Sequence, residues 1–200
     1  MDVCNDKDRF IKVMLDFQNE IEKGLNITIN LEEIEQLKDV TEGKFSKGRF
    51  KDLLVKKISI HAVFKYIFIR MAEDVLKIVN SKFNISGINN WNEMSKNYRG
   101  EYFELYKLAC EDLRRSDQTR ELFETSMYDN YILKLQTLIF NNKNDNYFEK
   151  LKEYDFKSLD PNTAASLFDA LYPSEYRSIL QNFMEESKIT THQMNDLGLL

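Results

Sequence analysis

The sequence predicts an all-α protein, an irregular multi-helix bundle around one long buried helix at about residues 50–80. Six glycines and two prolines in 200 residues are few for the many turns that a β-protein needs. Apolar residues recur at spacings of three and four, the period of an amphipathic helix. A composition of 42% hydrophobic and 30% charged residues is that of an ordinary globular protein, long enough to bury a core.

The N-terminal part predicts two helices followed by a loop. The first helix has one apolar stripe, formed by Phe10, Met14, Phe17 and Ile21. Gly24 is well placed to end this helix. Asn30, followed by acidic residues, predicts the N-cap of a short helix that reaches about Lys38. Residues 41–49 contain two glycines and three basic residues and are expected to form a loop.

The central helix is expected from about Phe50 to Asn80, because this stretch is apolar over much of a helical circumference. Its apolar positions are Leu53, Leu54, Ile58, Val63, Phe64, Ile67, Phe68 and Met71. The following residues, 81–97, are rich in Asn, Ser and Gly and predict an irregular connection.

Four further helices are predicted in the second half of the chain. Helical spacing covers 98–115 and returns from Tyr131 to Ile139, before a polar run at 141–146. Asp160-Pro161 predicts a helix start, with a capping carboxylate and proline at the first helical position. Pro173 ends that helix and opens the last one.

The polar run also suggests how the chain divides into parts. We expect a main helical domain at 1–142 and a C-terminal helical subdomain at 143–200, packed on the first or leading to an absent catalytic domain.

Motifs for nucleotide, metal and cofactor binding are absent from the sequence. The glycines form neither a P-loop nor G-x-G-x-x-G, and Cys4, Cys110, His61 and His192 lack the ligand spacing of a zinc site. We therefore expect no catalytic residues, no metal and no cofactor. His61 lies on the central helix, where a structural or surface role is expected.

Acidic residues allow two further interpretations. Glu42-Gly43-Lys44 matches the E-x-K of restriction nucleases, yet it falls in a loop of a chain without the expected β-strands. Glu73 and Asp74 are adjacent on a helix and diverge by about 100°, so they cannot converge on a metal by themselves. Together with Arg70 they are expected to form a structural ion-pair network.

A basic strip at 38–57 is the best candidate for a binding surface. It has a net charge of +4, whereas the whole chain has −5. A basic loop leading into a helix N-terminus can meet phosphate oxygens, so contacts to the DNA backbone are one interpretation. A solvated charge run is the other. The candidate DNA contacts are Lys44, Lys47, Arg49, Lys51, Lys56 and Lys57. A weaker basic cluster consists of Arg114, Arg115 and Arg120.

Three stretches carry a family resemblance. SIHAVFKYIFIRMAEDVLKI (59–78) and YFELYKLACEDLRRSDQTRELFETSMYDNYI (102–132) resemble the helical region before the catalytic domain of type IIG and BREX-like N6-adenine DNA methyltransferases. An F-I-R-x-x-E-D-like signature runs from Phe68 to Asp74, and L-F-like and Y-D-like pairs occur as Leu122-Phe123 and Tyr128-Asp129. YDFKSLDPNTAASLFDALYP (154–173) resembles the stretch that introduces the methyltransferase domain.

The resemblance implies a part in DNA methylation and phage defence, with DNA and a methyltransferase or restriction subunit as partners. The chain departs from the family because it has neither the glycine-rich S-adenosylmethionine loop nor the N/D-P-P-Y tetrapeptide. Methyl transfer by these residues alone is excluded. The alternative is a protein-interaction or regulatory adaptor that does not bind DNA.

Location is also predicted from the sequence. The charged N-terminus lacks the apolar core of a signal peptide, and the most apolar stretch, 58–79, carries too many charges for a membrane span. Two cysteines without a paired motif suit reduced thiols in the cytoplasm.

Overall fold

The computed structural model describes residues 1–32, 34, 45–95, 102–135, 146–181 and 183. These residues form an all-α fold, which confirms the predicted fold class, and their only β contact is an isolated bridge between Asp2 and Asp155. The α-helices are α1 (Lys7–Thr28), α3 (Lys47–Met71), α4 (Ile85–Met94), α5 (Tyr102–Arg115), α6 (Met127–Lys134), α7 (Tyr147–Leu151), α8 (Pro161–Leu171) and α9 (Ser174–Gln181).

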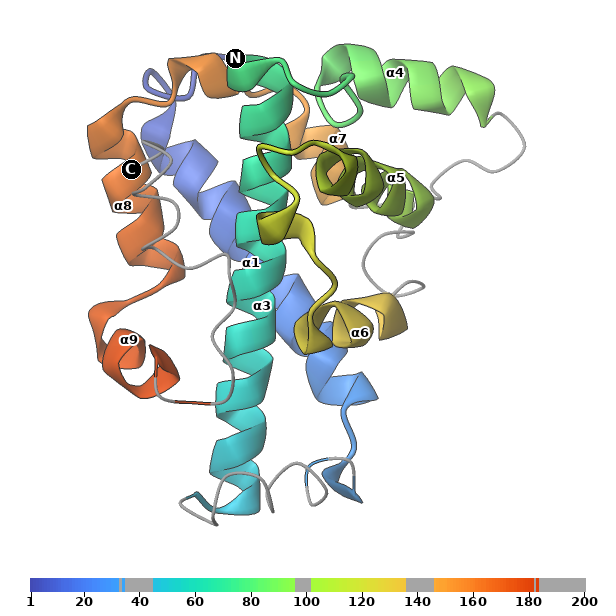
Figure 1. Cartoon of the computed structure of the whole chain (residues 1–200). Coiled ribbons are helices and arrows are strands. Elements are labelled where there is room, and N and C mark those ends of the chain that lie inside the picture. The colour runs from blue at the N-terminus through green and yellow to red at the C-terminus, as the bar shows by residue number, and fades with distance from the viewer. Residues whose placement is uncertain (33, 35–44, 96–101, 136–145, 182, 184–200) are drawn as a thin grey trace.

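Helix α3 is the central element of the bundle. Every residue from Leu53 to Met71 except Lys56 is buried. Figure 1 shows α3 passing through the middle of the molecule, with α1 crossing it, α8 and α9 on one side and α4, α5 and α6 on the other. A helix that is apolar around its circumference needs neighbours on all sides, and this arrangement supplies them.

Both ends of α3 differ from the predicted range. The helix begins three residues earlier, because the Ser46 side chain accepts a hydrogen bond from the Arg49 amide at 3.3 Å. The α-helix ends at Met71 and continues as one π-helical segment, η2 (Ala72–Leu76), before Lys77 adopts φ = 53°. The left-handed residue turns the chain away, so the helix stops short of residue 80.

Helix α1 is longer than predicted. Gly24 lies inside it, and the helix reaches Thr28. A helical glycine costs only about 1 kcal/mol relative to alanine, which is too little to end a helix whose neighbouring Ile21 and Leu25 are buried.

The prediction of an irregular connection at 81–97 was wrong, because α4 lies within it. Asn84 caps this helix through its Oδ1, which accepts the Gly87 amide at 3.0 Å. An added Cβ at Gly87 would lie 2.4 Å from the backbone of Lys82, so the helix and the preceding turn approach more closely than a side chain allows. The Asn and Gly residues here serve a cap and a close contact.

The C-terminal elements agree with the predicted start signal at Asp160. Its Oδ1 accepts the amides of Asn162 at 2.8 Å and Thr163 at 3.1 Å, and Pro161 opens α8. Helix α7 was not predicted, since five residues are too few to reveal a period. Two 3-10 segments, η3 (Glu121–Phe123) and η4 (Phe156–Ser158), complete the described elements.

One hydrophobic cluster joins the two halves of the chain. Phe10 in α1 packs on Tyr154 with ring centroids 5.0 Å apart, and Phe64 in α3 stacks on Phe168 in α8 at 5.6 Å. The predicted domain boundary near 142 lies outside the described residues. Within the described part of the chain, no helix combines the length and the apolar character that crossing a membrane requires.

Candidate functional site

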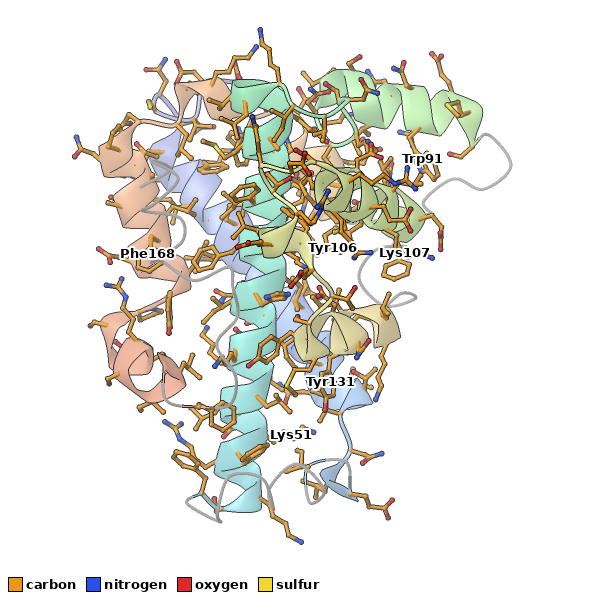
Figure 2. All side chains as sticks on the ribbon, in the orientation of Figure 1. Lys51, Trp91, Tyr106, Lys107, Tyr131 and Phe168 are labelled. Carbon is orange, nitrogen blue, oxygen red and sulfur yellow. The ribbon has the colours of Figure 1, made fainter. Side chains whose placement is uncertain are left out.

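The start of α3 presents the basic surface that the sequence singled out. Lys47 and Arg49 are exposed in its first turn, and Lys51 is half-buried with its Nζ donating to the Asn26 carbonyl at 2.8 Å. Figure 2 labels Lys51 near this end of the helix. Lys44 lies outside the described residues.

The other two predicted DNA contacts, Lys56 and Lys57, bind groups within the protein. Lys56 forms an ion pair with Glu22, with Nζ and Oε1 2.9 Å apart. Lys57 is buried, and its Nζ donates to the carbonyl of Leu180 at 3.0 Å and to that of Phe183. The prediction that Lys57 contacts DNA was therefore wrong, because this buried lysine holds the C-terminal end of α9 against α3.

The N-terminal end of α3, where Lys47, Arg49 and Lys51 remain as candidate contacts, has an electrostatic feature of its own. The first turn contains no acidic residue. The N-terminal end of a helix carries a partial positive charge, and acidic side chains are the usual complement there. Lys47, Arg49 and Lys51 add to that positive charge, so an external anion would be attracted to this end.

The opposite end of α3 holds a buried charge network of the three residues that the sequence grouped. The Arg70 Nη2 atom lies 2.6 Å from Asp74 Oδ2, and Arg70 Nε lies 3.9 Å from Glu73 Oε2. Arg70 also donates to the carbonyls of Leu151 at 2.9 Å and Tyr154 at 2.7 Å. The guanidinium thereby ties α3 to the last residue of α7 and to the segment that follows it.

Both acidic residues of this network accept hydrogen bonds from N–H groups that precede α4. Glu73 Oε1 accepts the Lys82 amide at 2.9 Å, and burial raises the pKa of Glu73. Asp74 Oδ1 accepts the Asn84 side-chain amide at 3.1 Å. These bonds fold the chain back after η2 and fix the start of α4, which is a structural task.

A second buried polar cluster lies midway along α3. Asp129 Oδ1 in α6 lies 3.2 Å from His61 Nε2 and 2.6 Å from Lys65 Nζ. The Ser126 hydroxyl donates to Asp129 Oδ2 at 2.9 Å and lies 3.4 Å from His61 Nε2. In a catalytic triad the serine and the carboxylate meet different ring nitrogens, whereas here both face Nε2. The cluster is a structural junction between α3 and α6.

Burial governs the titration of this cluster. It lowers the pKa of His61, which favours the neutral imidazole. Burial alone would raise the pKa of Asp129, but the hydrogen bond from His61 and the charge and hydrogen bond of Lys65 hold it well below its usual range. No local sequence pattern links Lys65 to Asp129, because the two residues are 64 positions apart.

A cavity of about 400 Å³ opens at the far end of α3 from the basic residues. Its wall combines Arg70 and Asp74 with the start of α4 and the segment 152–157. The lining residues are Met1, Arg70, Asp74, Asn84, Ile85, Ser86, Lys152, Glu153, Tyr154, Asp155 and Lys157.

The other candidates have local roles or lie outside the described part. Arg114 Nε donates to the Phe123 carbonyl at 3.0 Å, and Arg120 pairs with Asp117 at 2.6 Å. Trp91 is partly buried against the core. The Glu42-Gly43-Lys44 motif and His192 fall outside the described residues, which contain no group of three His, Cys, Asp or Glu side chains suited to a metal ion.

Comparison with protein-family models, with curated proteins and with solved structures gives no significant match.

Proposed function

We propose that the chain is a non-catalytic helical module of a DNA methyltransferase or restriction-modification system, acting in the cytoplasm in phage defence. It contacts the DNA backbone through Lys47, Arg49 and Lys51 and docks a catalytic partner with another surface. The observation that carries the proposal is the exposed basic first turn of α3, which contains no acidic residue. The family resemblance at 59–78, 102–132 and 154–173 supplies the biological setting.

The proposed contact is electrostatic. Ammonium and guanidinium groups bind phosphate oxygens without reading the bases, so the contact orients the module on the duplex and carries no sequence information. Each phosphate that is neutralised releases condensed counterions, and the affinity then falls as the salt concentration rises. Recognition of a DNA sequence is left to the partner.

A protein-interaction adaptor is the alternative function, and one observation favours it. Ile27 and Leu31 follow Asn26, the residue whose carbonyl binds Lys51, and they are 76% and 54% exposed. Exposed aliphatic side chains beside basic ones suit a protein surface as well as a phosphate backbone.

The decisive experiment measures binding of the full chain to a labelled DNA duplex as salt rises from about 50 to about 200 mM. Replacement of Lys47, Arg49 and Lys51 with alanine is expected to weaken binding at every salt concentration. It should also reduce the slope of log affinity against log salt by about 0.9 for each phosphate contact removed.

The matched control replaces Arg9, Lys12 and Lys150 with alanine, which removes the same charge from exposed positions away from the start of α3. This control should retain the wild-type slope. No DNA binding at low salt, or equal slopes for the two variants, would reject the DNA-contacting role and favour the adaptor.

A further inference from the structure

The surface around the cavity gathers apolar side chains that face solvent. Of the nine large apolar side chains that are exposed in the described part of the chain, two line the cavity. Met1 and Ile85 line the cavity and are 50% and 45% exposed. Val75 and Leu76, 42% and 45% exposed, directly follow the lining residue Asp74. A group of exposed apolar residues beside a hollow is typical of an interaction surface.

The segment 153–157 adds charges of both signs to this surface. Glu153, Asp155 and Lys157 are exposed, whereas the intervening Tyr154 and Phe156 are buried. The outward side of the segment therefore carries two negative charges followed by one positive charge. Within the described part of the chain, the Lys157 ammonium and the Glu153 carboxylate have no ion-pair partner.

Two buried side chains, Arg70 and Asp74, hold the backbone that carries these charges. Arg70 donates to the carbonyls of Leu151 and Tyr154 and lies 4.5 Å above the ring of Phe156. Asp74 Oδ2 accepts the Phe156 amide at 3.4 Å. A surface that is already ordered loses little conformational entropy on binding, so it suits a stable contact.

We propose that this surface binds a second copy of the chain, related by a two-fold axis. A two-fold contact brings the same patch of both copies together, so a patch that carries both signs complements itself. Lys157 then faces Glu153 of the partner subunit, and the reciprocal pair forms across the axis. The exposed apolar side chains of the two copies meet beside these pairs. DNA is disfavoured as the occupant because Glu153 and Asp155 would face its phosphates.

The location has a consequence for the whole assembly. A helix of 25 residues is about 37 Å long, so the dimer surface lies far from Lys47 and Arg49 at the start of α3. Dimerisation would leave both basic ends accessible. This consequence rests on the proposed function, whereas the dimer itself does not.

The test is sedimentation equilibrium of the full chain without DNA, over a range of protein concentrations. The wild type should associate to a dimer. Lys157→Glu and Glu153→Lys each place like charges across the axis and should weaken the dimer by at least about tenfold. An equimolar mixture of these two variants should form heterodimers, and the double variant should recover the homodimer.

Two further variants make the result specific. Ile85→Asp removes an apolar contact at the first position of α4, where aspartate suits the helix, and it should weaken the dimer. Asp117→Lys with Arg120→Glu inverts an exposed pair outside the cavity lining and should leave the dimer unchanged.

A monomer at every concentration would overturn the proposal. A dimer that is indifferent to Lys157→Glu, or a mixture that fails to recover association, would overturn it equally. Since DNA binding is measured separately with variants at the other end of α3, failure of the dimer and failure of the proposed function are distinguishable.

Discussion

Individual residues of α3 carry ionisable groups into the core, and each has a partner that offsets its loss of hydration. His61 and Lys65 face Asp129, Lys57 binds two carbonyls, and Arg70 faces Asp74. Unpaired buried charges are strongly destabilising, whereas paired ones mainly restrict which elements can pack together. The stability of the domain should therefore depend on pH through these groups.

We predict that the free energy of unfolding falls as pH drops below 6.5, the ordinary pKa of histidine. Burial lowers the pKa of His61 in the folded state, so the unfolded chain takes up a proton first and acid favours unfolding. The stabilisation by neutral His61 is fully present above pH 6.5. It is lost with decreasing pH, by up to about 1.4 kcal/mol per pH unit, until the folded pKa is reached.

Urea denaturation between about pH 5 and about pH 7.5 would measure this effect, with His61→Gln as the comparison. The variant should lack this component of the pH dependence. His192 remains in both proteins, so the difference between them isolates His61. Parallel stability curves would contradict the assignment.

Sequence reasoning finds side-chain partners only when they are close in the chain. Arg70, Glu73 and Asp74 were grouped because spacings of three and four share a helix face. The distance in sequence from His61 to Asp129 is 68 residues, and no local pattern connects them. Lys57 shows the reverse problem, since a lysine in a basic run gives no sign that the fold will bury it.

Among the elements, α4 depends most on a single small residue. Gly87→Ala should destabilise the protein by about 1–3 kcal/mol, the usual cost of overpacking, because the new Cβ would meet the Lys82 backbone at 2.4 Å. Gly48→Ala in the first turn of α3 is the matched change, with nothing within 4 Å of the added carbon. It should stabilise by about 0.4–1 kcal/mol through the unfolded state.

Thermal unfolding of the Gly87→Ala and Gly48→Ala variants measures these opposite changes in stability. Equal melting temperatures would mean that the close approach of α4 to residue 82 does not constrain the fold. The same region explains why α4 escaped the sequence analysis: Asn84 and Gly87 resemble loop residues, and their roles as cap and contact depend on tertiary structure. The start of α8 at Asp160-Pro161 could be predicted because the capping residue directly precedes the helix in the sequence.

At the scale of the whole molecule, α3 is the buried central helix that the sequence predicts. The predicted division near residue 142 is different, because side chains from both predicted parts pack in one shared core. Phe10 packs on Tyr154 and Phe156, and Phe64 stacks on Phe168. Periodicity predicts helices, yet it does not tell which helices bury one another's faces. That information lies in contacts between residues more than a hundred positions apart.

We predict that the fragment 1–142 does not fold cooperatively by itself. Removing the later residues would expose Phe10 and Phe64 and leave the Arg70 guanidinium without the carbonyls of Leu151 and Tyr154. Without these acceptors, and in contact with water, the Arg70 guanidinium cannot hold η2 in place. The loss of helical structure should then spread from η2 along α3. Calorimetry of the fragment should show no cooperative transition. The full chain, measured in parallel, should show a single cooperative transition. A cooperative transition in 1–142 would instead support two separately folding parts.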